Sequence, residues 1–122
     1  MNKIQKAFTL LELLVVIGII GILLAFVTVG FTSAQKQGRD TRRKTDLAAI
    51  QNALEQYYSQ NSFVYPSNCV GGAGVTAYFT GGVVPTDPLS TQSYVWACST
   101  TSYSVTATLE KDSSQLIVRN LQ

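Results

Sequence analysis

The chain has 122 residues, a formal net charge of +2 and no histidine. The small net charge does not by itself indicate a nucleic-acid partner, and the lack of histidine excludes imidazole catalysis and most zinc sites. Serine and threonine are abundant, but the sequence offers no base to activate them, so we do not expect an enzyme.

Residues 1–7 form a short polar leader with two lysines, followed by an apolar stretch over residues 8–31. The 19 residues 13–31 carry no charge, and as a helix they would cover about 28 Å, close to the thickness of a hydrocarbon core. We therefore expect residues 8–31 to span a membrane. A secretory signal cleaved after residues 32–34 and a plain uncleaved anchor are the alternatives.

Glu12 is the only charged residue of the apolar stretch. An acidic side chain inside a bilayer costs about 2.5–3.5 kcal/mol, and no lysine or arginine lies between Ala7 and Gln35 to neutralise it. We expect the cation to come from another chain, for which a freed α-amino group at Phe8 would be suitable. The simpler alternative is an interfacial glutamate that reaches the membrane surface.

The order of basic leader, small residue and Phe-Thr-Leu-Leu-Glu before an apolar stretch resembles the class III leader of type IV pilins and type II secretion pseudopilins. The resemblance implies cleavage between Ala7 and Phe8 by a prepilin peptidase and N-methylation of Phe8. It also implies that Glu12 acts in assembly, by pairing with the N-terminal amine of a neighbouring subunit. The family usually has glycine where this chain has Ala7.

The partners that this resemblance implies are further copies of the chain, joined through the N-terminal helix, the prepilin peptidase and an inner-membrane assembly platform. Membrane lipid would surround the helix before assembly. The expected location is a single pass through the inner membrane with the C-terminal part outside the cytoplasm, and then a periplasmic or cell-surface filament. Counting positive charges on each side of the span favours the opposite orientation.

Beyond the span, apolar residues recur at helical spacing, which predicts the amphipathic half of one long helix over residues 32–60. These residues are Leu47, Ile50, Leu54, Tyr57 and Tyr58. A basic run over residues 36–44, interleaved with Asp40 and followed by Asp46, is most simply a solvated collar. Charge complementarity between stacked subunits and contact with anionic lipid or nucleic acid are the alternatives.

Residues 61–92 are rich in glycine, proline, serine and asparagine and are expected to be a connecting loop. Cys69 lies in this loop and Cys98 beyond it. Outside the cytoplasm they would form a disulfide, worth about 3.6 kcal/mol for a loop of about 30 residues in the chain-entropy model. Two free buried thiols are the alternative.

The loop also resembles that of the major pseudopilins in its Tyr-Pro at residues 65–66 and its Pro-Thr-Asp-Pro at residues 85–88. That family normally has a late acidic calcium loop. Glu110, Lys111 and Asp112 occupy the comparable region here, and they supply too few oxygen ligands for calcium. We therefore expect no metal and no cofactor.

Alternation of apolar and polar residues over 102–109 predicts a half-buried antiparallel strand, with neighbours over 93–98 and 115–121. Residues 93–122 would form a three-stranded meander whose apolar face covers the amphipathic half-helix, with Trp96 and several tyrosines in the core. The expected fold is α+β, a pilin-like lollipop in which residues 32–122 form one globular domain. A filament subunit is the favoured function, and a membrane-anchored or secreted small binding domain is the alternative.

Overall fold

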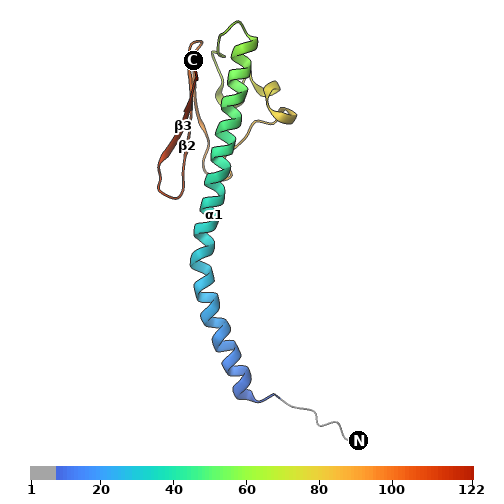
Figure 1. Ribbon diagram of the computed structural model, residues 1–122, viewed down its shortest axis with the longest axis vertical. Helices are drawn as coiled ribbons and strands as arrows, with labels where there is room; N and C mark the ends of the chain where they lie inside the picture. Colours follow the sequence, from blue (N-terminus) through green and yellow to red (C-terminus); the bar gives the residue numbers. More distant parts are fainter. Residues whose placement is uncertain (1–7) are drawn as a thin grey trace, which may run out of the picture. The chain divides into compact units, whose positions relative to one another are not determined.

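The computed structural model describes residues 8–122. For residues 28 and 29 it describes the backbone alone. Ala7, which is expected to precede the cleaved bond, lies outside the described residues together with the rest of the leader. The chain divides after Gln35 into an N-terminal unit and a second unit, Lys36–Gln122. The predicted α+β arrangement is confirmed: one long helix is followed by a three-stranded antiparallel sheet (Figure 1).

Helix α1 runs over Leu10–Gln60. In the N-terminal unit it is apolar on all sides, with a mean hydropathy of 3.0 over 18 residues, and is long enough to cross a membrane. A helix that is apolar all round needs lipid or other apolar helices around it. At its other end, Asn61 Nδ2 donates to the carbonyl of Tyr57 at 2.8 Å, and the Phe63 N–H donates to the carbonyl of Tyr58 at 3.1 Å. These two bonds satisfy carbonyls that the end of the helix leaves free.

The sheet consists of β1 (Val95–Cys98), β2 (Tyr103–Thr108) and β3 (Gln115–Arg119), in the order β1-β2-β3 with antiparallel pairing throughout. The predicted meander is therefore confirmed. Compared with the prediction, β1 begins two residues later and β3 ends two residues earlier, as is usual for element boundaries. Trp96 pairs with Val105 of β2, and Val105 pairs with Val118 of β3.

The core of the second unit lies between α1 and one face of the sheet. Helix residues at i, i+3 and i+7 bury their side chains completely, as do alternate residues of β2. The predicted helical core residues Leu47, Ile50 and Leu54 are all fully buried. Trp96 is only partly buried and packs against this core, which includes the buried tyrosines Tyr65, Tyr94 and Tyr103.

The segment between α1 and β1 contains three short 3₁₀ helices, η1 (Val70–Gly72), η2 (Thr76–Tyr78) and η3 (Thr80–Gly82), which follow one another in the yellow part of Figure 1. Gly72 has a φ of +81° and lies against Val84, so that a Cβ there would come within 2.5 Å of Val84 Cγ2. Both the backbone angle and the close contact require glycine at this turn.

Candidate assembly site and buried ion-pair cluster

Glu12 lies in the first turn of α1 and forms a capping box with Thr9, the residue before the helix. The N–H and the hydroxyl of Thr9 both donate to Glu12 Oε2 at 3.0 Å, and the Glu12 N–H donates to Thr9 Oγ1 at 3.2 Å. This reciprocal pattern satisfies backbone N–H groups that have no partner within the helix. The Glu12 side chain therefore folds back towards the Phe8–Thr9 peptide.

A cation from another chain remains the predicted partner of the Glu12 charge. The structure adds two local hydrogen-bond donors from Thr9, which the sequence analysis did not predict. Both donors are neutral, so the negative charge of Glu12 is not compensated by the hydrogen bonds that it makes with Thr9. Phe8 is 86% exposed, which leaves the residue at the expected new N-terminus open to contact.

Arg43 is the centre of a buried ion-pair cluster in the second unit, and its side chain is completely buried. Its Nε and Nη2 donate to the two carboxylate oxygens of Asp87 at 2.7 and 2.8 Å. Its Nη1 donates to Asp40 Oδ1 and to Glu110 Oε1, each at 2.7 Å. One guanidinium thus joins three carboxylates from the helix, the connecting segment and the turn between β2 and β3.

A second arginine and two backbone groups complete the ion-pair cluster. Arg39 binds both oxygens of Glu110 at 2.7 Å. Asp40 also accepts from the N–H groups of Glu110 and Lys111, at 2.9 and 3.0 Å. The turn that follows β2 is therefore fixed to α1 by side-chain and backbone bonds together.

The ion-pair cluster keeps its carboxylates ionised. Hydrogen bonds from Arg39 and then Arg43 lower the pKa of Glu110 to about 2, against the opposing effect of burial. For Asp40, burial alone would raise the pKa, but the hydrogen bonds from Glu110 N–H, Arg43 and Lys111 N–H outweigh it and lower the pKa. For Asp87, the opposing effect of burial is likewise outweighed, chiefly by Arg43, and its pKa is lowered.

The interpretation of the basic run as a solvated collar is therefore wrong for part of the run. Asp40 and Arg43 are buried, and Arg39 is half-buried against Glu110. The spacing of Arg43 to Leu47, Ile50 and Leu54 (i+4, i+7 and i+11) was the sequence signal that places Arg43 on the core face of the helix. Lys36, Arg42 and Lys44 are exposed, as a collar requires.

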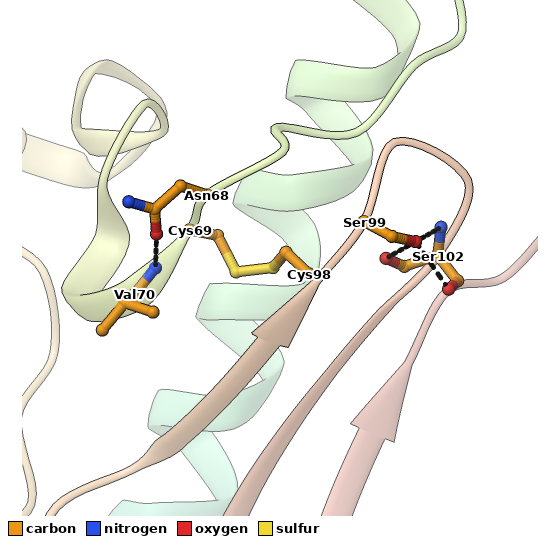
Figure 2. Close-up of a disulfide and its surroundings, with 6 residues drawn as sticks. All are labelled: Asn68, Cys69, Val70, Cys98, Ser99 and Ser102. Atoms are coloured by element: carbon orange, nitrogen blue, oxygen red, sulfur yellow. Dashed lines mark hydrogen bonds between the residues drawn. A yellow bond between two sulfur atoms is a disulfide. The ribbon is translucent and has the colours of Figure 1, made fainter.

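Cys69 and Cys98 form the expected disulfide, with their Cα atoms 5.9 Å apart (Figure 2). It joins the residue before η1 to the last residue of β1. The turns beside both cysteines are fixed by side chains: Asn68 Oδ1 accepts from the Val70 N–H at 3.1 Å, and Ser99 Oγ accepts from the Ser102 N–H at 3.1 Å. The connecting segment is thereby held against the edge of the sheet.

Glu55 is a second, half-buried acceptor on α1. It accepts hydrogen bonds from the hydroxyls of Tyr103 at 2.9 Å and Tyr65 at 3.1 Å, and from the Leu121 N–H at 3.1 Å. Burial, and then the hydrogen bond to Glu55, raises the pKa of both tyrosines. These bonds tie the tyrosine core and the C-terminal segment to the helix.

Within residues 8–122, no group of three or more acidic or cysteine side chains is arranged to hold a metal ion. The carboxylates near the β2–β3 turn are instead engaged by Arg39 and Arg43. This arrangement serves to join segments of the chain and contains no nucleophile next to a base.

Comparison with known proteins supports the resemblance that the sequence analysis found at the N-terminus. Residues 2–28 match the family model described as the prokaryotic N-terminal methylation motif. The chain is 40% identical over 73 residues to type II secretion system core protein G of Vibrio cholerae, covering 58% of this chain and 49% of that protein. It is 40% identical over 81 residues to the protein of the same name from Pseudomonas aeruginosa, covering 66% and 56%.

A type IV major pilin protein of Myxococcus xanthus is 36% identical over 59 residues, covering 48% of this chain and 27% of that pilin. The matches to core protein G span about half the length of those relatives, and no solved structure matches the chain. The methylation motif, the relatives of both kinds and the long helix followed by an antiparallel sheet have one common explanation. In its N-terminal motif and in its sequence, the chain is therefore similar to type IV pilins and type II secretion pseudopilins.

Proposed function

We propose that the chain is a structural subunit of a type IV pilus-like filament or a type II secretion pseudopilus, and that it has no catalytic activity. A prepilin peptidase cleaves it between Ala7 and Phe8, Phe8 is N-methylated, and the apolar half of α1 holds the subunit in the inner membrane with the second unit outside the cytoplasm. An inner-membrane assembly platform then adds it to a polymer joined through the N-terminal helices.

The observation that carries this proposal is the position of Glu12. It is the only charge in the apolar part of α1, four residues after Phe8, and its side chain is directed back towards the Phe8–Thr9 peptide. A membrane anchor alone has no use for a carboxylate at this place, which costs free energy in lipid. A neighbouring subunit whose Phe8 amine is free can neutralise that charge.

Three variants separate the charge of Glu12 from its capping role. Glu12→Gln removes the charge and keeps an acceptor for Thr9, Glu12→Ala removes both, and Thr9→Ala weakens the cap and keeps the charge. Removing one member of a buried ion pair costs about 3–5 kcal/mol at each added subunit, whereas losing a cap costs about 1 kcal/mol once. Both Glu12 variants should fail to assemble, and Thr9→Ala should assemble.

The measurement is the yield of sheared filaments beside the membrane-inserted pool, with intact-mass analysis of both. We expect the Glu12 variants to accumulate in the membrane as processed chains that begin at Phe8. Normal filament yield from Glu12→Gln would refute the pairing, and a mature N-terminus at Gln35 would instead establish a secretory signal.

We also propose that the second unit folds without calcium. The turn over residues 109–114 is attached to α1 by Arg39, Arg43 and the Asp40 carboxylate. Two guanidinium groups supply the positive charge that a divalent ion would otherwise bring to such a turn. Calcium is accordingly left out of the proposed assembly mechanism.

A further inference from the structure

The second unit has a groove of about 660 Å³ between η1, the Pro-Thr-Asp-Pro segment and β1. A volume of this size is within the range of sites that bind small molecules. The Cys69–Cys98 disulfide joins the residue before η1 to the end of β1, so two walls of the groove are tied to each other. The groove is therefore a fixed part of this unit.

One part of the groove wall is apolar and rigid. Trp96, the single tryptophan of the chain, borders the groove and is half-buried. Pro85, Pro88 and the exposed Val70 border it as well. Tryptophan and proline rings offer apolar surface that loses little conformational freedom when a ligand covers it. This part of the wall suits a ligand with an apolar face.

Another part of the wall carries neutral hydrogen-bonding groups, from Thr86, Ser90, Gln92 and Ser93. Within the residues that the structure describes, none of these four side chains has a hydrogen-bond partner. The serines of the turn over residues 99–102, in contrast, bond to each other. Three hydroxyls and one amide are therefore free to bond to a ligand.

Gln92 carries the clearest sign of a missing ligand group. Across residues 8–122, its Oε1 is the buried side-chain oxygen that lacks a hydrogen-bond partner. An acceptor buried without a donor costs free energy, so such atoms are rare in folded proteins. Because no hydrogen bond holds this amide, the side chain can turn towards the groove at no cost in bonds. A hydroxyl on a ligand would then supply the donor.

The charge of the groove limits the ligand further. Asp87 is the only charged residue among those that border it, and its side chain is 2% exposed. Arg43 and the Leu89 N–H already bind its carboxylate. A phosphate, a carboxylate or an amine would therefore lose its water in the groove without gaining a counter-charge. The ligand that fits is neutral, with an apolar face and several hydroxyls.

We propose that this groove binds a neutral saccharide. The C–H face of one sugar ring lies against Trp96, and hydroxyls at the ring edge bond to Gln92, Ser90 and Ser93. A polypeptide added as a further β-strand suits the site less well, because the connecting segment already lies against β1. This inference does not depend on filament assembly, since it concerns the second unit alone.

Trp96 gives the test a signal from the groove itself, since the chain has no other tryptophan. The full-length chain is kept in lauryldimethylamine oxide micelles, because maltoside detergents are themselves saccharides. It is titrated with cellobiose, maltose and N,N′-diacetylchitobiose. We expect at least one of the three to change the tryptophan emission to saturation. Saturation-transfer NMR should show the C–H protons of that disaccharide in contact with the chain.

Gln92→Met removes the amide and keeps the length of the side chain. It should weaken the binding of that disaccharide about two- to twelvefold, the effect of one lost hydrogen bond. The midpoint of thermal unfolding should not fall, because Oε1 makes no bond within the described chain. Ser90→Ala with Ser93→Ala should weaken binding at least about fourfold. Gln115→Met is the matched control, an exposed glutamine on β3 outside the groove, and should bind as the unchanged chain does.

No saturable binding of any of the three disaccharides would overturn the proposal. Equal binding by the unchanged chain and by both groove variants would also overturn it. A lower unfolding midpoint in Gln92→Met would contradict the role of Gln92 as a ligand-binding residue. Binding of a neutral proline-rich peptide that Gln92→Met loses, without binding of any disaccharide, would assign the groove to a polypeptide instead.

Discussion

Arg43 binds both carboxylate oxygens of Asp87, a residue 44 positions further along the chain, at 2.7 and 2.8 Å. The pair connects the middle of α1 to the Pro-Thr-Asp-Pro segment, and the Leu89 N–H donates to the same carboxylate at 2.8 Å. The segment has no regular secondary structure around Asp87. The bidentate bond therefore fixes a part of the chain that backbone pairing leaves free.

Arg43→Met should destabilise the second unit by about 3–5 kcal/mol, because it leaves buried carboxylates without their cation. Arg42→Met is the matched control: Arg42 is one position away, its side chain is 63% exposed, and its pair with Asp46 is long. The control should change the free energy of unfolding by less than about 1 kcal/mol. Urea unfolding of the full chain in mild detergent, with the circular dichroism of the tyrosines as the readout, measures the free energy of unfolding of both variants. Equal losses in the two variants would contradict the central role of Arg43.

Acid should weaken the second unit in a defined range. The pKa of Glu110 falls from an ordinary value of 4.5 to about 2 in the folded chain. A lowered pKa means that Glu110 contributes stability above about pH 4.5, and that this contribution is lost as the pH falls towards 2. The Glu110→Gln variant should have a lower free energy of unfolding at pH 7 than the unchanged chain. Between pH 4.5 and 2, this free energy should fall less in the variant than in the unchanged chain. Parallel stability curves for the two chains over this range would exclude Glu110 as a source of the pH dependence.

Removal of the disulfide should cost about 3–4 kcal/mol, since the sequence separation of Cys69 and Cys98 is 29 residues. Serine at both positions should lower the midpoint of thermal unfolding without changing the secondary structure. Thiol labelling of the unreduced, denatured chain gives an independent measurement. Two reactive thiols per chain would contradict the bond.

Gly72→Ala should destabilise the second unit, because the positive φ and the contact with Val84 both exclude a Cβ. Gly71 is the matched control. It too has a positive φ, of +62°, but no atom of the chain lies within 4 Å of a Cβ placed there. Thermal unfolding should show a clearly larger loss for Gly72→Ala than for Gly71→Ala, and equal losses would mean that the contact with Val84 is unimportant.

Calcium should have no effect on the unfolding midpoint. Any ion that bound the folded chain alone would raise the midpoint in proportion to the logarithm of its concentration. We expect the same midpoint in excess calcium and in excess chelator, because Arg39 and Arg43 already neutralise Glu110. A higher midpoint in calcium would reveal a site that the arginines do not replace.

The sequence allowed the helix, the three strands and the core residues Leu47, Ile50 and Leu54 to be predicted, because periodicity depends on local spacing alone. Burial of Arg43 was missed, although it shares the helical face of those residues. The position of its main partner, Asp87, could not be foreseen, because a long-range pair depends on how the connecting segment returns to the helix.

The sequence analysis predicted a role for the charge of Glu12, but it did not predict that Glu12 forms a capping box with Thr9. Thr-x-x-Glu before an apolar run is a known signature of a helix start, and it is present at residues 9–12. A charge in lipid predicts a cationic partner, and this expectation does not reveal the neutral donors of Thr9. Whether a neighbouring chain provides that cation is a question about two molecules, which one sequence with its local spacing does not answer.

The capping box would make entry into the proposed polymer an exchange of partners. In the single chain, Glu12 Oε2 already accepts two hydrogen bonds from Thr9. Under the proposed pairing, an incoming ammonium group would replace these neutral donors by a charged one. A subunit held in the bilayer would then keep this oxygen hydrogen-bonded until a chain with a free N-terminus arrived.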